Sequence, residues 1–348
     1  MTAPDIVKQF GYLSVGVNDL NEGCEFYSRF VRLEQTERVG DTAFMTGGLE
    51  HHWIRLEQGS GQGLKRIGYE VTDENSFALA RTRLREWGID FTEGGDPKKD
   101  RVARWLRFVD PGGFEIELFS GMWERGVAPV NSGVTLEKFL HAGWEVTDWD
   151  TTTRFYQEVL GFKASDWIGD MAGFFRAGDR YHHSLVLIRA QQPSFNHFCI
   201  QVESIDDVMR FRHNAARHGV EIRDDILRHA PSGSIGVYIK DAARGFAIEY
   251  CVGHPQVDDA THTARTLPLA PETVDVWRAP LPDIRPPAPP SAPPSAPPSA
   301  PPGAGSAVPA GPPAAGSVPA DAPPSPAAAV LAGQGRDITA LLETADSR

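Results

Sequence analysis

The sequence has few cysteines and no excess of basic residues. Three cysteines, Cys24, Cys199 and Cys251, occur in 348 residues. An odd number of cysteines within apolar patterns does not suggest a disulfide framework, so we expect reduced core thiols, as in cytoplasmic proteins. The formal net charge is −12, whereas phosphate backbones and anionic membranes are bound by clustered Lys and Arg. The charge balance therefore argues against nucleic acid or a membrane surface as a partner.

The sequence also lacks the segments that direct export or membrane insertion. The start, MTAPDIVKQF, has no basic stretch followed by an apolar core. No apolar run reaches the roughly 20 residues that cross a bilayer. We therefore expect a cytoplasmic protein.

Composition changes sharply near residue 280. From Pro286 to about Ala332 the chain is almost wholly Pro, Ala, Ser and Gly, with the repeat PPSAPPSAPPSAPP. Such a segment has too little apolar area to offset the entropy lost on ordering, and its prolines favour extended conformations. The sequence predicts a disordered C-terminal tail over residues 281–348.

The preceding part of the chain is an internal duplication. YLSVGVNDLNEGCEFYSRFVRLE, which begins at Tyr12, matches HAGWEVTDWDTTTRFYQEVLGFK, which begins at His141. IGYEVTDENSFALARTRLREWGIDF matches FCIQVESIDDVMRFRHNAARHGVEI, and VARWLRFVDPGGFEIELFSG matches SIGVYIKDAARGFAIEYCVG. The segments of the first two pairs each read as a strand, an acidic turn and an amphipathic helix. Those of the third pair read as two strands joined by a tight turn. We predict an α+β fold of two tandem modules, residues 1–128 and 129–280, each made of two related units.

Sheets built from paired units of this kind curve around a cleft, and a polar side chain on the concave face needs a partner or a ligand. The second module offers His141 and His197, each expected near the start of a strand, and Glu249, expected near the end of one. Taken singly, a histidine there is more often a structural hydrogen-bonding residue, and Glu249 could be an edge-strand carboxylate. Their equivalent positions in related units favour a shared metal site.

The duplication provides an internal comparison. Alignment of the modules places Tyr12 opposite His141, Arg66 opposite His197 and Glu117 opposite Glu249. Two imidazoles and one carboxylate form the facial triad that leaves open positions on non-haem Fe(II). An Arg and a Glu cannot hold a divalent cation but can pair with each other. We therefore predict metal only in the second module, and an ion pair between Arg66 and Glu117 in the first.

The second module also carries four motifs in order: HAGWEVTDW…RFYQEVLGFKASDWIGD, YHHSLVLI, FNHFCIQVES and LRHAPSGSIGVYIKDAARGFAIEY. With them the chain resembles, over about residues 8–275, the vicinal oxygen chelate superfamily, and within it the two-module type I extradiol catechol dioxygenases. The resemblance implies paired βαβββ units in each module. It also implies a small catecholic substrate, O2 as co-substrate, a role in aromatic catabolism and a homo-oligomer.

The resemblance also assigns roles to residues of this sequence. It implies that His141, His197 and Glu249 bind Fe(II), with Mn(II) as the alternative ion. The second histidine of the HHS motif, His183, matches the family's catalytic histidine, although the spacing leaves His182 open. The family's substrate-binding histidine and tyrosine fall on His229 and Tyr238. A side chain with a pKa near neutrality, such as histidine, suits proton transfer during ring cleavage.

Two other functions fit the same scaffold. A glyoxalase-like isomerase or lyase would use the metal as a Lewis acid and would not need His183, His229 and Tyr238 together. A non-catalytic module that binds aromatic ligands would not need an intact set of two histidines and one glutamate.

Overall fold

The computed structural model describes residues 5–130 and 133–279, and the predicted tail, residues 281–348, lies outside them. The described strands form two sheets, of eight strands in the order β2-β3-β4-β1-β5-β8-β7-β6 and of nine in the order β14-β15-β16-β13-β9-β12-β11-β10-β17. Both sheets lie in one compact unit that ends at Arg278. The predicted α+β architecture of two modules is confirmed, whereas the boundary at 128/129 stays a prediction.

The elements alternate as the duplication predicts. The first sheet contains β1 (Val7–Val17), β2 (Glu34–Val39), β3 (Thr42–Thr46), β4 (Ile54–Gln58), β5 (Gly63–Val71), β6 (Phe91–Gly94), β7 (Arg104–Val109) and β8 (Glu115–Ser120). The second contains β9 (Leu136–Val146), β10 (Lys163–Ile168), β11 (Ala172–Arg176), β12 (Leu185–Arg189), β13 (Ser194–Val202), β14 (Ile222–Arg228), β15 (Ile235–Asp241), β16 (Phe246–Val252) and β17 (Arg265–Leu267). The helices are α1 (Leu20–Arg29), α2 (Glu74–Glu86), α3 (Pro97–Asp100), α4 (Trp149–Glu158), α5 (Ile205–Arg217), α6 (Pro271–Val274) and the 3₁₀ helix η1 (Val276–Arg278).

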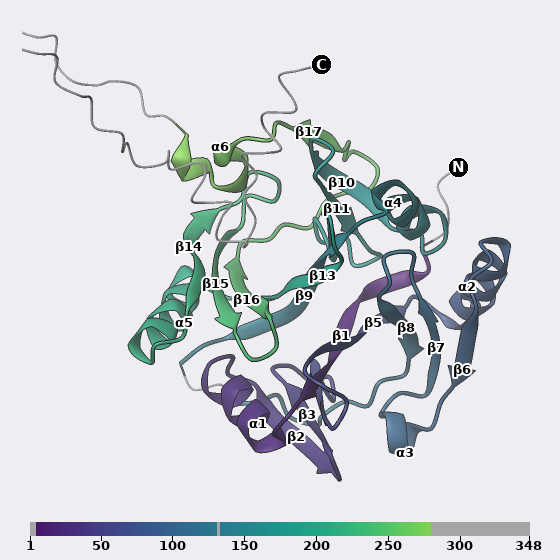
Figure 1. The fold of residues 1–348 in the computed structure, drawn as a ribbon, viewed down its shortest axis with the longest axis horizontal. Coiled ribbons are helices and arrows are strands. Elements are labelled where there is room, and N and C mark those ends of the chain that lie inside the picture. The colour runs from purple at the N-terminus through teal and green to yellow at the C-terminus, as the bar shows by residue number, and fades with distance from the viewer. Residues whose placement is uncertain (1–4, 131–132, 280–348) are drawn as a thin grey trace, which may run out of the picture. The chain divides into compact units, whose positions relative to one another are not determined.

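Each sheet joins two βαβββ units through their first strands. In the first sheet β1 pairs parallel with β4 of its own unit and antiparallel with β5 of the next. In the second sheet β9 pairs in the same way with β12 and β13. Figure 1 shows β1 and β9 in the middle of the molecule, with α1, α2, α4 and α5 at the periphery. Side chains from the central strands therefore meet inside each module.

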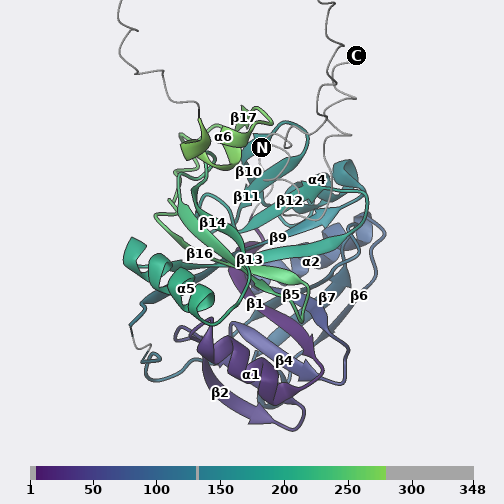
Figure 2. The same ribbon diagram turned by 60° about the vertical axis from the view of Figure 1, so that its left-hand side comes forward.

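The acidic turns predicted from the repeats are helix N-caps. Asp19 accepts hydrogen bonds from the backbone of Asn21 and Glu22 at the start of α1, and Asp148 accepts one from Thr151 at the start of α4. Such caps satisfy amide groups that have no partner within the helix. Figure 2 shows α1 beside β4 and α5 beside β16. No helix of the described residues is long and apolar enough to cross a membrane.

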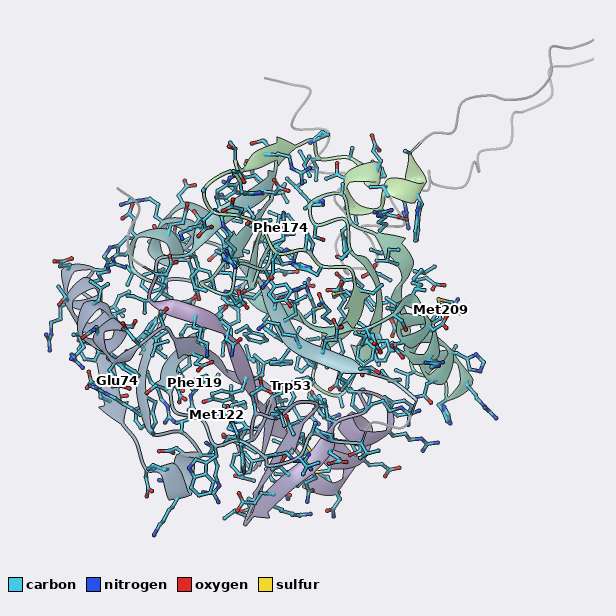
Figure 3. All side chains as sticks on the ribbon, turned by 180° about the vertical axis from the view of Figure 1, so that it is seen from behind. Trp53, Glu74, Phe119, Met122, Phe174 and Met209 are labelled. Atoms are coloured by element: carbon cyan, nitrogen blue, oxygen red, sulfur yellow. The ribbon has the colours of Figure 1, made fainter. Side chains whose placement is uncertain are left out.

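Aromatic side chains fill the space between the modules. Phe139 of β9 stacks on Phe10 of β1, with ring centroids 4.5 Å apart, and on Trp53 at 5.6 Å. Trp53 is labelled in Figure 3, where it lies well inside the molecule. Buried aromatic contacts of this kind contribute large apolar area and a favourable ring geometry. The modules are thus packed through a shared core.

Two equivalent hydrogen bonds join the modules across this core. The hydroxyl of Tyr27 in α1 donates to Asp241 Oδ2 at 3.2 Å, and the hydroxyl of Tyr156 in α4 donates to Asp110 Oδ2 at 2.7 Å. Tyr27 and Tyr156 occupy matching positions of the repeat, and all four residues are buried. Each module therefore supplies one donor and one acceptor to the other.

This arrangement predicts a pH-dependent contribution from Asp110. Burial raises its pKa to about 6, despite hydrogen bonds from Phe114 and Tyr156 that lower it. Because the folded pKa exceeds the unfolded value near 4, this carboxyl's contribution to stability is complete below about pH 4 and is lost as pH rises through about 6. An asparagine at this position does not titrate, so Asp110→Asn should not lose stability in this way. We expect the free energy of unfolding of the variant, relative to that of the wild type, to rise by up to ~3 kcal/mol between pH 4 and 7.

Urea unfolding at several pH values measures this difference. Asp19→Asn, which changes an exposed N-cap, is the control and should follow the wild-type pH profile. A constant difference between Asp110→Asn and wild type across this pH range would contradict the expectation.

Candidate metal centre

His141, His197 and Glu249 lie on three adjacent strands of the second sheet. His141 is on β9, His197 on β13 and Glu249 on β16, and β13 pairs with both of the other strands. The sequence placed these residues near strand ends, which is wrong, because each lies inside its strand. The strands extend further because their flanking residues continue the ladders. The three side chains are buried, at 2%, 6% and 1% exposure.

Three donor atoms converge in this cluster. His141 Nε2 lies 3.2 Å from His197 Nε2 and 3.2 Å from Glu249 Oε2, and His197 Nε2 lies 3.8 Å from Glu249 Oε2. An ion about 2.0–2.2 Å from nitrogen and oxygen ligands keeps them roughly 3–3.5 Å apart. Glu249 Oε2 is fully buried and has no hydrogen-bond partner, which is costly for a carboxylate without a cation. The residues present therefore fit a divalent metal ion.

Neighbouring residues orient His197 for ligation. Its Nδ1 lies 2.8 Å from Asn196 Oδ1, which also accepts a hydrogen bond from Arg223 Nη1 at 3.0 Å. Because this amide oxygen only accepts, His197 carries its proton on Nδ1 and has a free lone pair on Nε2. Burial holds the pKa of His197 well below its usual range, which favours the neutral ring that a metal requires. Asn196 was not among the residues predicted from the sequence.

Glu249 remains ionised in this setting. Burial opposes its ionisation, but hydrogen bonds and positive charge from His141 and His229, in their protonated forms, outweigh burial and hold the pKa of Glu249 well below its usual range. His229 Nε2 lies 3.5 Å from Glu249 Oε1. The carboxylate thus keeps the charge that a cation would need.

The structure brings His229 and Tyr238 together beside this carboxylate. His229 Nδ1 donates to the carbonyl of Val274 at 3.1 Å, so its Nε2 accepts the hydroxyl proton of Tyr238 at 2.9 Å. Burial, followed by the charge of Glu249, raises the pKa of Tyr238 well above its usual range, so the phenol stays protonated. The His229 side chain is 22% exposed, which makes this the accessible side of the cluster.

The two histidines of the HHS motif face different neighbours. The His183 ring centroid lies 4.3 Å from that of His141 and 5.1 Å from that of Phe174. His182 turns away, with Nε2 3.1 Å from Asp166 Oδ2. The geometry therefore favours His183 over His182 as the residue beside the metal ligands.

His254 is a further residue of the cluster that the sequence analysis missed. Its ring centroid lies 4.3 Å from that of His183, and its Nε2 accepts the backbone N–H of His183 at 3.3 Å. The atoms of His141, His183 and His254 are close enough to form an alternative set of ligands. That set contains no carboxylate. The position of His254 just after β16, in VGHP, was its only signal in the sequence.

Two surface cavities of the described residues lie elsewhere. A cavity of about 530 Å³ lies between α5 and the segment at Phe30 and Arg32, and one of about 390 Å³ adjoins Phe114 and Phe246. Neither is lined by a residue of the His141, His197 and Glu249 cluster. Chemistry, rather than cavity size, therefore identifies the candidate site.

The equivalent place in the first module is filled by a different set of contacts. Glu117 is 1% exposed and accepts hydrogen bonds from the Tyr12 hydroxyl at 2.7 Å and from Arg107 Nε at 2.6 Å. Arg66 Nη1 lies 3.9 Å from Glu117, and its Nε donates to Glu115 instead. The predicted convergence of Tyr12, Arg66 and Glu117 is confirmed, but Arg107, on neighbouring β7, is the main partner. The cross-strand pair Arg107–Glu117 was not visible in the alignment of modules.

Apolar packing completes this filling. Tyr12, Val102 and Phe119 form a small buried cluster against Met122. Figure 3 shows Phe119 and Met122 close together in the first module. A Cβ added at Gly68 would lie 2.2 Å from the Tyr12 ring, so this glycine makes room for a tyrosine where the second module has His141.

Comparison with known proteins agrees with the geometry. The model of the Glyoxalase/Bleomycin resistance protein/Dioxygenase superfamily matches residues 138–250. An iron-dependent extradiol dioxygenase of Rhodococcus jostii (strain RHA1) is 31% identical over 229 residues, which cover 60% of this chain and 76% of the relative. The chain belongs to the extradiol dioxygenase family. Biphenyl-2,3-diol 1,2-dioxygenase of Pseudomonas sp. (strain KKS102) is 27% identical to the present chain over 277 residues, which cover 74% of this chain and 94% of the relative.

Solved structures share the fold. An Mn(II)-bound glyoxalase from Novosphingobium aromaticivorans has a TM-score of 0.72 and 24% identity, and the match covers 79% of this chain and 92% of that one. Homoprotocatechuate 2,3-dioxygenase from Arthrobacter globiformis has a TM-score of 0.71 and 22% identity over 81% of this chain and 90% of that one. At these identities the likeness shows the fold alone, and the site must be judged by its residues.

The contacts of Glu117 predict which arginine stabilises the first module. Arg107→Ala leaves the buried carboxylate with the Tyr12 hydroxyl and with Arg66 Nη1 at 3.9 Å. Because Arg107 is partly exposed, we expect a loss between the ~1 kcal/mol of a surface pair and the ~3–5 kcal/mol of a buried one. Arg66→Ala should cost less, since Arg66 bonds mainly to Glu115. Urea unfolding of both variants tests the ranking, and the reverse order would restore Arg66 as the main partner.

The second module's cluster predicts metal content directly. We expect roughly one divalent ion per chain in the wild type, and loss of nearly all of it in His141→Ala, because two ligands hold such an ion poorly. Tyr12→Phe, the matched position of the first module, should retain the wild-type content. Metal analysis of the dialysed proteins distinguishes the two. Full metal content in His141→Ala would remove His141 from the ligand set.

Proposed function

We propose that this chain cleaves a catecholic ring beside its hydroxyl groups with O2, using Fe(II) held by His141, His197 and Glu249. The convergence of three buried donor atoms within 3.2–3.8 Å of one another carries this proposal. The names of two relatives, a biphenyl-2,3-diol 1,2-dioxygenase and an iron-dependent extradiol dioxygenase, support ring cleavage and iron. Mn(II) is the alternative ion, since imidazole and carboxylate ligands accept both.

Protein residues supply what the metal cannot. Ground-state O2 is a triplet and reacts slowly with a singlet aromatic ring. When bound, the ion would provide open positions at which catechol and O2 could exchange electrons. The chain must then bind the catechol, remove its protons and return them. Residues 129–280 hold every group that we assign to these tasks.

Tyr238 and His229 are proposed to bind the substrate. Both lie beside Glu249, and the phenol of Tyr238 remains protonated. A protonated phenol can donate a hydrogen bond to a catechol oxygen, which stabilises the oxygen as it loses its own proton. His229, which is the more exposed of the two, would orient the ring as it enters.

His183 is proposed as the residue that moves a proton. Its ring faces that of His141, and burial holds its pKa well below the usual range, so that it is neutral. A neutral imidazole can take a proton from the catechol hydroxyl and later give it to a substrate oxygen. A glyoxalase-like isomerase would not need His183, His229 and Tyr238 in these places, which is why ring cleavage fits better.

The proposed function is tested by anaerobic loading with Fe(II), followed by a panel of monocyclic and bicyclic catechols with O2. We expect oxygen uptake and a yellow ring-opened product with at least one catechol. Loading with Mn(II) in parallel shows which ion supports turnover. Bound metal with no oxygen uptake for any catechol, together with isomerisation of a thiol adduct, would replace ring cleavage by the glyoxalase-like reaction.

The role of His183 gives a separate prediction. We expect His183→Phe to keep metal and catechol binding but to lower turnover by about 10²-fold or more, the scale of a positioned proton-transfer group. His52→Phe, at the matched position of the first module, is the control and should retain turnover. Steady-state oxygen uptake and metal analysis provide the measurements. Loss of metal in His183→Phe would make His183 a ligand instead.

A further inference from the structure

A chain of hydrogen bonds ends at His183. Arg265 Nε donates to Asp166 Oδ1 at 3.0 Å, and its Nη2 donates to Oδ2. Asp166 Oδ2 lies 3.1 Å from His182 Nε2, and His182 Nδ1 lies 3.0 Å from His183 Nδ1. We call Arg265, Asp166, His182 and His183 the histidine relay. The parallel pairing of β10 with β17 places Arg265 beside Asp166.

The partners along the relay determine where each proton lies. An ionised carboxylate only accepts, so His182 must carry a proton on Nε2. Burial opposes the ionisation of Asp166, but hydrogen bonds from His182 and Arg265 lower its pKa to about 2. Burial also lowers the pKa of His182, which favours a neutral ring. A neutral His182 with a proton on Nε2 has a bare Nδ1, and this atom can only accept.

The tautomer of His182 in turn determines that of His183. Because His182 Nδ1 accepts, the proton between the two rings belongs to His183 Nδ1. A neutral His183 with its proton on Nδ1 has a bare Nε2, the atom on the far side of its ring. The backbone N–H of His183 also donates to His254 Nε2 at 3.3 Å, which holds the residue in place. The ring is therefore both oriented and restricted to one tautomer.

We propose that Arg265, Asp166 and His182 are positioning residues that hold His183 as the Nδ1–H tautomer, so that its Nε2 lone pair can accept a proton from the bound substrate. This inference rests on the proposed function. The proton moves from the substrate hydroxyl to Nε2, and the resulting imidazolium, stabilised through His182 by Asp166, returns it to a substrate oxygen. No electron is transferred in this step. The alternative tautomer would present an N–H and could not act as the acceptor.

The first module contains the same arrangement without a metal site. Arg101 binds Glu37 through Nε at 2.6 Å and Nη2 at 2.7 Å. Glu37 Oε2 lies 3.1 Å from His51 Nε2, and His51 Nδ1 lies 3.2 Å from His52 Nδ1. Its last ring, His52, faces Tyr12, at 4.7 Å between centroids, as His183 faces His141.

This counterpart shows that the hydrogen-bond pattern needs no metal ligands nearby. The relay should therefore keep its tautomers in metal-free protein. It also provides a control, because a change in the first-module pair disturbs the same hydrogen-bond pattern away from the proposed metal ligands.

The tautomer is measured directly by nitrogen NMR of the metal-free full chain labelled with ¹⁵N-histidine. A ring nitrogen that bears hydrogen resonates far from one that does not, and long-range proton–nitrogen correlations connect both nitrogens of one ring. Comparison with His183→Phe and His182→Phe assigns the two rings among the 11 histidines. We expect His183 to show a protonated Nδ1 and a bare Nε2. A protonated Nε2 in the wild type would overturn the inference.

Variants of His182 test the consequence for turnover. In His182→Phe the acceptor is lost, so His183 should shift toward its other tautomer and kcat should fall about 10–100-fold, with KM and metal content nearly unchanged. His182→Gln, which keeps an acceptor oxygen, should recover part of both. His51→Phe should lower the melting temperature by a similar amount but leave kcat at the wild-type value.

The outcomes separate this inference from the proposed function. Unchanged kcat in His182→Phe, or an equal fall in His51→Phe, would reduce the relay to a structural role. If His182→Phe does not fold, the wild-type tautomer and the kcat of His182→Gln relative to wild type still decide. If the Fe(II)-loaded wild type cleaves no catechol, the proposed function fails, and so does the catalytic part of this inference, whereas the tautomer result stands by itself.

Discussion

A buried carboxylate at the centre of each module must be neutralised, and the rest of each inner face is arranged around that requirement. In the first module Glu117 has a phenol and a guanidinium within 2.7 Å, so both of its oxygens are satisfied by the protein. In the second module Glu249 Oε2 is buried without a hydrogen bond and faces two imidazole nitrogens. Leaving a charge in this state costs several kcal/mol. The second arrangement therefore fits a cation, whereas the carboxylate of the first already has two protein partners.

The duplicated architecture makes this difference possible. Each sheet brings the first strands of two units side by side, so residues from separate units meet without long loops. The modules are then fixed to each other by the Tyr27–Asp241 and Tyr156–Asp110 hydrogen bonds and by stacked aromatic rings. Each bond takes its donor from one module and its acceptor from the other. Displacement of α1 or α4 would therefore leave a buried aspartate of the other module without its tyrosine donor. The first module thus contributes contacts that hold the second in place.

The repeats predicted the architecture well because hydrophobic period and helix caps are local features. Matching Asp19 with Asp148 was enough to align Tyr12 with His141. Matching Gly113–Phe114 with Gly245–Phe246 aligned Glu117 with Glu249, and the structure places each glutamate beside the residue aligned in its own module. The alignment of modules did not reveal contacts from strands or loops other than those that carry the aligned residues. Arg107 reaches Glu117 because β7 pairs with β8, and His254 reaches His183 from a loop after β16. Neither contact can be predicted from residue spacing within one segment, so the sequence analysis did not predict either. It also did not predict that the strands continue on both sides of His141 and Glu249.

The comparison of the two modules also separates what the fold maintains from what the chemistry requires. The pair of adjacent histidines with an acid and an arginine occurs in both modules. It cannot by itself mark a reactive site. The modules differ at three matching positions. The first module has Tyr12 and Arg66 where the second has His141 and His197. Gly68 pairs with Tyr12, whereas Cys199 pairs with His141. Arg107, the main partner of Glu117, also has a different counterpart, because Tyr238 pairs with Glu249 across the strands. The first cluster is therefore neutralised by protein side chains, whereas the second presents two imidazoles to its carboxylate. His183 and His52 have matching hydrogen bonds, but His183 lies beside His141 whereas His52 lies beside Tyr12. The position of His183, rather than its own hydrogen bonds, is therefore the basis on which we propose a part for it in the reaction.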